Sequence, residues 1–132
     1  MASRGINVVI TVIGGAGFVG SSLTYLLAGG QKAFEVGDLR PNKKFPEKSK
    51  IFDVRSKQDA SIQVKGDVVV NLAAVHRDDV TDPKEYYSTN VEGARVLCDV
   101  CEEKGINKIV FTSSVAVYGF APPGTGEDGA TN

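Results

Sequence analysis

The amino-acid sequence predicts an α/β fold in which parallel strands form one open, doubly wound sheet. Short β-branched apolar runs alternate with segments whose apolar residues recur at helical spacing. A cluster of glycines follows the first run at once, and an aspartate, Asp38, ends the second. Strands that alternate with helices pair in parallel through right-handed crossovers. We therefore expect a Rossmann-type sheet of about five strands in the order 3-2-1-4-5.

The first strand and helix are the best defined elements. Residues 8–13 (VVITVI) form a nearly continuous apolar run, which is typical of a strand covered on both faces. Leucines at helical spacing follow from residue 18, and Gly29 and Gly30 are expected to end that helix. A second strand is expected at 33–36, although Glu35 and Gly37 are poor residues for a buried strand.

The middle of the chain predicts two further strands and a short helix. A polar connection at 40–50 precedes a third strand at 51–54. Ser56 can cap a small helix that runs through Val64, with Gly66 as its stop. Residues 67–72 are expected to form the fourth strand.

A long helix is predicted from Asp82 to about Lys104. Asp82 suits the N-cap and Pro83 the first helical position, and Gly105 is expected to close the helix. Its predicted buried stripe consists of Tyr87, Val91, Ala94, Leu97, Cys98 and Cys101. The fifth strand is expected at 109–112, and the chain from Gly119 onward has the composition of a loop.

Composition excludes several classes of protein. The 132 residues are 42% hydrophobic and 23% charged, as in one soluble domain with a real core. The net charge is −1 and the basic residues are scattered, so a nucleic-acid-binding surface is not expected. All apolar stretches are far shorter than the roughly 20 residues that a membrane span needs. No apolar signal core precedes the first strand, which favours the cytoplasm.

Cys98 and Cys101 form a C-x-x-C pattern with two interpretations. The pattern is found in redox and metal sites, but no second cysteine pair exists and His76 is the only histidine. Residues three apart share a helix face, so two thiols packed in the core are the simpler interpretation. No metal site is expected.

Residues 15–20 form a G-x-G-x-x-G pattern between a predicted strand and a predicted helix. Glycines allow a tight turn and let a pyrophosphate approach a backbone that carries no Cβ. The free N–H groups and positive dipole end of the helix then face the phosphates. The structural alternative is a glycine-rich turn that only joins strand to helix.

Asp38 lies eighteen residues beyond Gly20, where dinucleotide-binding domains carry an acid that accepts hydrogen bonds from the adenosine ribose. A carboxylate there repels a 2′-phosphate, which favours NAD over NADP. Arg40 weakens this preference because a guanidinium could pair with a 2′-phosphate. The structural alternative for Asp38 is a plain loop carboxylate.

The sequence resembles the NAD-dependent epimerase/dehydratase family, the extended short-chain dehydrogenase/reductases that act on nucleotide sugars. The resemblance rests on motifs that occur in order and cover nearly the whole chain: GGAGFVG at 14–20, DV at 53–54, NLAA at 71–74, NVEG at 90–93 and TSSVAVYG at 112–119. Ile13 departs from the family, which usually has Thr at that position.

The resemblance implies a cofactor site and a catalytic serine. Asp53 would accept a hydrogen bond from the exocyclic amine of adenine, and Asn90 would hold its helix and the cofactor in register. Ser114 would polarise the reacting sugar oxygen, although a strand-end serine can also satisfy nearby backbone. His76 would lie near the substrate or on a surface loop. The implied cofactor-binding residues are Gly14, Gly15, Gly17, Phe18, Val19, Gly20, Asp38, Arg40, Asp53, Val54, Leu72, Ala73, Ala74, Asn90, Thr112 and Ser113.

One part of the family's catalytic apparatus is missing. Its reaction uses a Tyr whose phenol pKa is lowered by a Lys four residues later. The four tyrosines, Tyr25, Tyr86, Tyr87 and Tyr118, are followed at that spacing by Gly, Asn, Val and Pro. An unassisted phenol titrates near 10, so none of them can replace the pair. We expect the chain to be the N-terminal fragment of a longer enzyme, with the C-terminal part of the fold absent.

The sequence thus predicts one domain, 1–132, which is the NAD-binding part of a nucleotide-sugar epimerase, dehydratase or reductase. Hydride would pass between the sugar carbon and the nicotinamide in the full enzyme. The family often forms a homodimer through the helix represented here by 83–104, but its partner helix would follow Asn132, so the oligomeric state stays open. The alternative is a non-catalytic dinucleotide-binding or sensing module. A Rossmann dehydrogenase outside this family is disfavoured because Ser114 and Asn90 would have no role in it.

Overall fold

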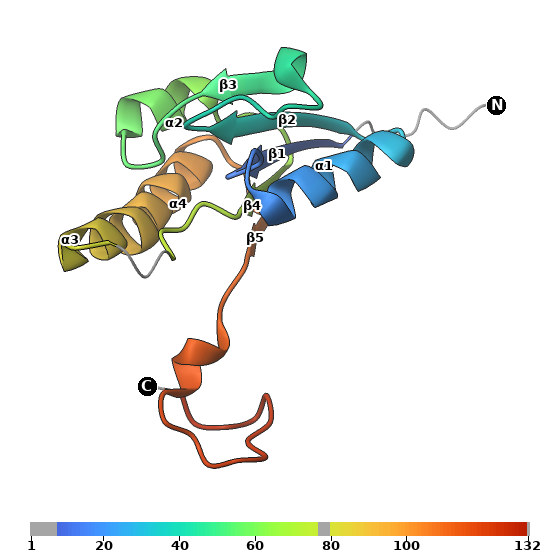
Figure 1. Cartoon of the computed structure of the whole chain (residues 1–132). Coiled ribbons are helices and arrows are strands. Elements are labelled where there is room, and N and C mark those ends of the chain that lie inside the picture. Colours follow the sequence, from blue (N-terminus) through green and yellow to red (C-terminus); the bar gives the residue numbers. More distant parts are fainter. Residues whose placement is uncertain (1–7, 77–79, 132) are drawn as a thin grey trace.

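The structure, a computed structural model, describes residues 8–76 and 80–131. Its centre is a five-stranded parallel sheet in the order β3-β2-β1-β4-β5, which confirms the predicted fold class and strand order (Figure 1). The strands are β1 (Val9–Ile13), β2 (Ala33–Asp38), β3 (Ser49–Ile51), β4 (Val68–Asn71) and β5 (Ile109–Phe111).

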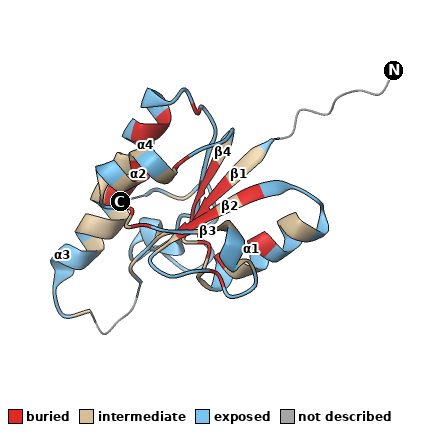
Figure 2. Ribbon diagram, turned by 90° about the horizontal axis from the view of Figure 1, so that it is seen from above, coloured by how far each residue is buried: buried red, intermediate tan, exposed pale blue. Residues whose placement is uncertain are grey.

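Helices cover the two faces of the sheet unequally. Helix α1 (Phe18–Gly29) lies on one face, and α2 (Lys57–Gln63) and α4 (Ala94–Glu103) lie on the other (Figures 1 and 2). The main core lies under α2 and α4, where Ala60, Val64, Leu97 and Val100 pack against the strands. Each of these helical side chains is at most 1% exposed. Among the described residues, no helix combines the length and the apolarity needed to cross a membrane.

The third strand lies earlier in the sequence than predicted. It comprises Ser49–Ile51 and pairs with β2, and the predicted strand residues 52–54 follow it. Phe52 extends the pairing by one hydrogen bond, N–H to the carbonyl of Asp38 at 3.0 Å, and its ring packs beneath Gly37. Phe52 and Val54 are therefore buried in the core after the chain has left the sheet.

The long helix begins as predicted but is not uniform. Asp82 caps α3 (Pro83–Tyr86) by accepting a hydrogen bond from the Lys84 amide at 2.9 Å. A π-helical segment, η2 (Tyr87–Gly93), then leads into α4. A π-segment widens the turn and rotates the residues around it relative to an α-helix. The buried stripe expected from α-helical spacing is partly wrong: Leu97 and Cys101 are buried as predicted, whereas Tyr87, Val91 and Cys98 are exposed.

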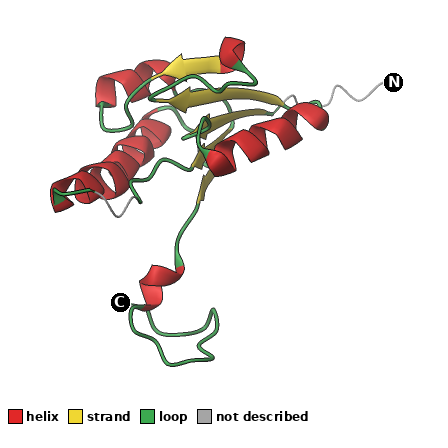
Figure 3. Cartoon of the chain, in the orientation of Figure 1, coloured by secondary structure: helices red, strands yellow, loops and turns green. Residues whose placement is uncertain are grey.

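The segment after β5 leaves the body of the domain. It runs out to a 3-10 turn, η3 (Val115–Tyr118), and a loop that folds back on it (Figures 1 and 3). The loop is held by the Tyr118 hydroxyl, which donates to the Glu127 carbonyl at 3.2 Å. The side chains of β5 itself, Ile109, Val110 and Phe111, are all exposed.

Candidate cofactor site

A cleft lies at the carboxyl ends of β1, β2 and β4, the point at which the strand order reverses. Ligands of open α/β sheets bind at such a switch point. The cleft encloses about 580 Å³, within the usual range for small-molecule sites. Its lining residues are Ile13, Gly14, Gly17, Gly37, Asp38, Leu39, Arg40, Phe52, Asp53, Val54, Arg55, Leu72, Ala73, Ala74, Val75, His76, Glu85 and Thr89.

Two glycines give the turn between β1 and α1 its shape. Gly14 has a φ of +76°, and a Cβ at that position would lie 2.7 Å from the backbone of Leu72 and Ala73. A Cβ at Gly20 would collide with the carbonyl oxygen of Gly14. The first turn of α1 can therefore pack directly on the glycine turn, and that turn can pack on the end of β4.

The N-terminus of α1, which we call its mouth, has no capping side chain. Gly17 is the N-cap and offers no capping side chain, and the first turn contains no acidic residue. The amide of Gly17 donates to the Gly14 carbonyl at 3.1 Å, and the Ser21 amide makes the first intrahelical bond, to the Gly17 carbonyl at 2.9 Å. The amides of Phe18, Val19 and Gly20 between them begin the helix without intrahelical acceptors. This cradle without side chains fits the pyrophosphate of a dinucleotide, because the exposed N–H groups and the helix dipole both favour an anion.

Asp38 is tied to the glycine turn at the end of β2. One carboxylate oxygen, Oδ2, accepts a hydrogen bond from the Ala16 amide at 2.9 Å. This bond fixes the carboxylate beside the α1 mouth, and Oδ1 has no hydrogen bond to another described residue. The structure therefore places Asp38 in the lining of the cleft and ties it to the glycine turn.

Sequence reasoning missed Asn42, which is only 1% exposed. Its Nδ2 donates to the Gly15 carbonyl at 2.8 Å and to Thr24 Oγ1 at 3.1 Å. Its Oδ1 accepts from the amides of Lys44 and Phe45. Asn42 thus joins the loop after β2 to the glycine turn and to α1. An asparagine in a polar loop signals a turn, but nothing in its spacing indicates contacts so distant in sequence.

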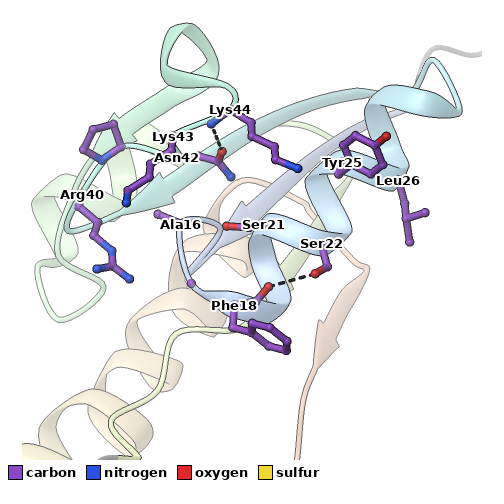
Figure 4. Close-up of a pocket in the computed structure, with 12 residues that line it drawn as sticks. Ala16, Phe18, Ser21, Ser22, Tyr25, Leu26, Arg40, Asn42, Lys43 and Lys44 are labelled. Atoms are coloured by element: carbon purple, nitrogen blue, oxygen red, sulfur yellow. Dashed lines mark hydrogen bonds between the residues drawn. The ribbon is translucent and has the colours of Figure 1, made fainter.

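A second groove lies between this loop and α1. Arg40, Lys43 and Lys44 come from the loop, and Ser21, Ser22 and Tyr25 face them from the helix (Figure 4). The Lys44 ammonium lies 4.5 Å from the centre of the Tyr25 ring. Arg40 lines both the groove and the cleft.

Asp53 and Val54 line the far end of the cleft, where the chain leaves β3. Val54 is buried in the core, and a Cβ at Gly93 of η2 would lie 2.8 Å from its Cγ1. Asp53 forms an ion pair with Arg55, which sequence reasoning also missed; Arg55 Nη2 lies 2.6 Å from Asp53 Oδ2. This hydrogen-bonded guanidinium holds the pKa of the Asp53 carboxyl below its usual value.

Asn90 does not line the cleft but fixes a segment that does. Its side-chain amide bonds the backbone of Val75, next to His76, in the chain after β4. Val75 and His76 both line the cleft together with Leu72, Ala73 and Ala74. His76 is exposed and borders the cleft, so the choice between a substrate-side residue and a surface loop residue stays a prediction.

Eight of the predicted residues do not line the cleft: Gly15, Phe18, Val19, Gly20, Asn90, Thr112, Ser113 and Ser114. Thr112, Ser113 and Ser114 are exposed and belong to the segment that leaves the domain after β5 (Figure 3). The Ser114 hydroxyl accepts a hydrogen bond from the Ala116 amide at 3.2 Å and caps η3. The cleft brings together ten of the predicted residues: Gly14, Gly17, Asp38, Arg40, Asp53, Val54, Leu72, Ala73, Ala74 and His76.

The family comparison agrees with the geometry. The model of the NAD dependent epimerase/dehydratase family matches residues 10–132. A 4-epimerase of N-acetyl-α-D-glucosaminyl-diphospho-ditrans,octacis-undecaprenol from Escherichia coli O157:H7 is 42% identical over 113 residues, which are 83% of this chain and 33% of that protein. A UDP-glucose 4-epimerase from Lacticaseibacillus casei is 32% identical over 121 residues, with 83% and 36% covered. The chain thus spans about a third of the length of these relatives.

Solved structures show the same likeness. A short-chain dehydrogenase/reductase superfamily protein from Agrobacterium tumefaciens with bound NAD gives a TM-score of 0.84 at 28% identity, covering 94% of this chain and 39% of that one. A UDP-glucose 4-epimerase from Brucella ovis in complex with NAD gives 0.83 at 30% identity, with 94% and 41% covered.

Proposed function

Because the chain belongs to the NAD dependent epimerase/dehydratase family, we propose that its cleft binds NAD and that it forms the cofactor-binding domain of a longer enzyme acting on a nucleotide sugar. NAD supplies the hydride acceptor when it is bound. The fold provides the binding and orientation that this chemistry needs. The reaction class we propose is epimerisation or dehydration through hydride exchange between a sugar carbon and the nicotinamide.

The observation that carries the proposal is the pairing of the uncapped α1 mouth with the Asp38 carboxylate. The helix begins at Phe18 without a capping side chain, and Asp38 is held next to it by the Ala16 amide. The amides suit a diphosphate and the remaining carboxylate oxygen suits a ribose diol. A free 2′-hydroxyl can donate to that oxygen, whereas a 2′-phosphate would be repelled. We therefore propose NAD rather than NADP as the cofactor.

The remaining residues would act at the two ends of the cofactor. Asp53 and Val54 would contact the adenine, and Leu72, Ala73 and Ala74 would pack against the cofactor beyond β4. Asn90 would act through Val75, which its side chain already holds. His76 would lie on the substrate side. These roles agree with the lining of the cleft.

Ser114 is proposed to polarise the sugar oxygen, with Thr112 and Ser113 contributing to cofactor binding. This role requires the segment after β5 to approach the cleft in the full enzyme, with a Tyr/Lys pair that these 132 residues lack. The chain alone should bind cofactor without turning over a nucleotide sugar. Measurable turnover by the 132 residues would contradict the requirement for that pair.

Calorimetric titration of the 132-residue chain with NAD tests the proposal directly. Asp38→Asn keeps the side-chain volume and removes the charge, and we expect it to weaken NAD binding roughly 10- to 100-fold, as for the loss of a charged hydrogen bond. Asp99→Asn, on the exposed face of α4, is the matched control and should leave affinity unchanged. An absence of binding heat in well-folded protein, or equal affinities in both variants, would refute the proposal.

We also propose that two copies pair through the helix at 83–104. The support is that Tyr87 is 57% exposed and Val91 is 40% exposed on this helix, so apolar surface remains for a second copy to cover. The cytoplasmic location expected from the sequence stays a prediction.

A further inference from the structure

Arg55 holds the carboxylate of Asp53 with three separate hydrogen atoms. The Arg55 backbone amide donates to Asp53 Oδ1 at 2.9 Å. The Nε–H is shared between Oδ1 at 2.9 Å and Oδ2 at 3.0 Å, and Nη2 donates to Oδ2 at 2.6 Å. The backbone and the side chain of Arg55 therefore donate hydrogen bonds to both carboxylate oxygens of Asp53. These bonds fix the orientation of the carboxylate and favour its charged form.

The carboxylate keeps one acceptor site. An ionised carboxylate offers about four lone-pair positions on its two oxygens. Arg55 supplies three hydrogens to them: the backbone N–H, the Nε–H and one Nη2 hydrogen. About one position is left for a donor from outside the pair. Both residues line the cleft, and the Asp53 side chain is 30% exposed, so a ligand in the cleft can reach that position.

The surroundings keep Asp53 charged. The bond from the Arg55 side chain is the largest cause that lowers the pKa of the Asp53 carboxyl, while partial burial opposes it. Glu85, which lines the same cleft from the first turn of α3, adds a further charge that favours ionised Arg55. Asp53 is therefore an acceptor and not a donor at neutral pH.

We propose that Arg55 is a positioning residue that sets base specificity: by orienting Asp53, it leaves one acceptor site that selects a base with an exocyclic amino group. This inference rests on the proposed binding of NAD, with its adenine at the Asp53 end of the cleft. Adenine presents a 6-amino donor to that site, whereas hypoxanthine presents a carbonyl oxygen in the same place. Two acceptors facing each other repel, so the hypoxanthine dinucleotide should be rejected.

The test compares two dinucleotides whose bases differ in the group at position 6 and in the hydrogen that hypoxanthine carries on N1. Calorimetry gives Kd for NAD and for nicotinamide hypoxanthine dinucleotide with the unmodified chain, Arg55→Gln and Arg55→Lys. The unmodified chain should favour NAD by roughly 10- to 100-fold, the usual effect of one hydrogen bond to a charged group. Arg55→Gln should reduce that preference to within about threefold, because the carboxylate is then free to rotate toward solvent. Arg55→Lys should give an intermediate ratio, since an ammonium cannot form the two-pronged contact.

Two further variants separate orientation from general effects. Asp53→Asn can accept from an amine or donate to a carbonyl, so its preference should also collapse. Arg95→Gln removes another exposed arginine–carboxylate pair, Arg95 with Glu92 at 2.8 Å, and should retain the full preference. Thermal melting of each variant without ligand identifies any variant that fails to fold. If Arg55→Gln fails to fold, Arg55→Lys, which keeps the positive charge, tests the same role.

The outcomes distinguish this inference from the proposed function. An unmodified chain that binds neither dinucleotide contradicts NAD binding itself. An unmodified chain that binds both equally, or an Arg55→Gln variant that keeps the full preference for NAD, overturns the role of Arg55 and leaves NAD binding intact. A preference for NAD over the hypoxanthine dinucleotide that falls only in the Arg55 and Asp53 variants supports the role of Arg55. A merely structural role would lower the affinity for both dinucleotides by the same factor and leave the preference unchanged.

Discussion

The side chain of Asn90 hydrogen-bonds both backbone groups of Val75. Asn90 Oδ1 accepts from the Val75 amide at 2.7 Å, and Asn90 Nδ2 donates to the Val75 carbonyl at 2.9 Å. The pair joins the π-helical segment η2 to the chain after β4, fifteen residues away in sequence. The Asn90 side chain supplies the donor and the acceptor that a neighbouring strand would supply to the Val75 backbone in a sheet. The segment that lines the cleft is therefore fixed although it is not part of a strand.

We expect Asn90→Ala to lower the free energy of unfolding by about 1–3 kcal/mol, because it leaves two half-buried backbone groups of Val75 without partners. NAD affinity should fall with it, since Val75 and His76 both line the cleft. Urea unfolding and calorimetry measure the two effects. Asn107→Ala, at an exposed position before β5, is the matched control and should change neither. Equal stability of the two variants would mean that the pair does not hold the cleft wall.

Gly14 and Gly105 separate backbone strain from steric collision. Both have positive φ, +76° and +68°, but only at Gly14 would a Cβ meet neighbouring atoms, at 2.7 Å; none lies within 4 Å at Gly105. Gly105→Ala should therefore cost about 1–2 kcal/mol, the usual penalty of a left-handed conformation. Gly14→Ala should cost more than that and should also weaken NAD binding, because the glycine turn must move away from β4. Chemical denaturation of both variants is the measurement, and equal costs would contradict the close approach.

The Asp53–Arg55 pair predicts a dependence of stability on pH. Arg55 lowers the pKa of Asp53 below its ordinary 3.8 in the folded state. A group with a lowered folded pKa contributes stability above its unfolded pKa, and that contribution is lost as the pH falls through the folded pKa. The stability difference between the unmodified chain and Asp53→Asn should thus be constant from pH 7 to 5 and shrink below about pH 4. Urea unfolding at several pH values checks this, and a difference that grows on acidification would show the wrong sign.

The parts of the fold that rest on local patterns were predictable from the sequence, and the parts that rest on packing were not. The run at 8–13 and the glycines after it fix β1, the turn and α1, because their signals are local. Phe52 and Val54 look like strand residues, yet they are buried by packing under Gly37 and against Gly93 after the strand has ended. Composition alone does not separate these two kinds of burial.

The candidate site divides in the same way. Gly17 and Asp38 were found because their spacing is set by one strand–helix–strand unit. Asn42 and Arg55 were missed because each acts through its side chain on backbone or carboxylate groups that the fold brings close. The exposure of Tyr87 and Val91 was missed because a π-segment shifts the helical period, and its hydrogen-bond pattern has no simple sequence signal. Cys98 was missed for another reason: the buried face of α4 passes through Leu97, Val100 and Cys101, and Cys98 lies beside it.

Pairing of two copies through the helix at 83–104 predicts a response to charge on its exposed face. Val91→Glu introduces a charge where a partner would bury an apolar side chain, and it should shift the protein toward monomer. Leu26→Glu changes a side chain that is more exposed still, at 70%, but lies on α1, and it should have no such effect. Sedimentation equilibrium over a range of concentrations measures both. A monomer in the unmodified chain would end the proposal of a dimer, at least for these 132 residues.

The two cysteines should differ sharply in reactivity. Cys98 is exposed, whereas Cys101 is 1% exposed, and burial raises the pKa of the Cys101 thiol. The thiolate is the form that reacts with thiol reagents. Cys101 should therefore react slowly, because the reagent cannot reach it and because its raised pKa lowers the fraction of thiolate. A thiol reagent at pH 8 should modify one cysteine quickly in the folded chain and the second only at the rate of unfolding. Cys98→Ser should abolish the fast phase and leave the slow one, and denaturant should make Cys101 fast. Two fast thiols in the folded protein would show that the face of α4 carrying Cys101 is not packed against the sheet.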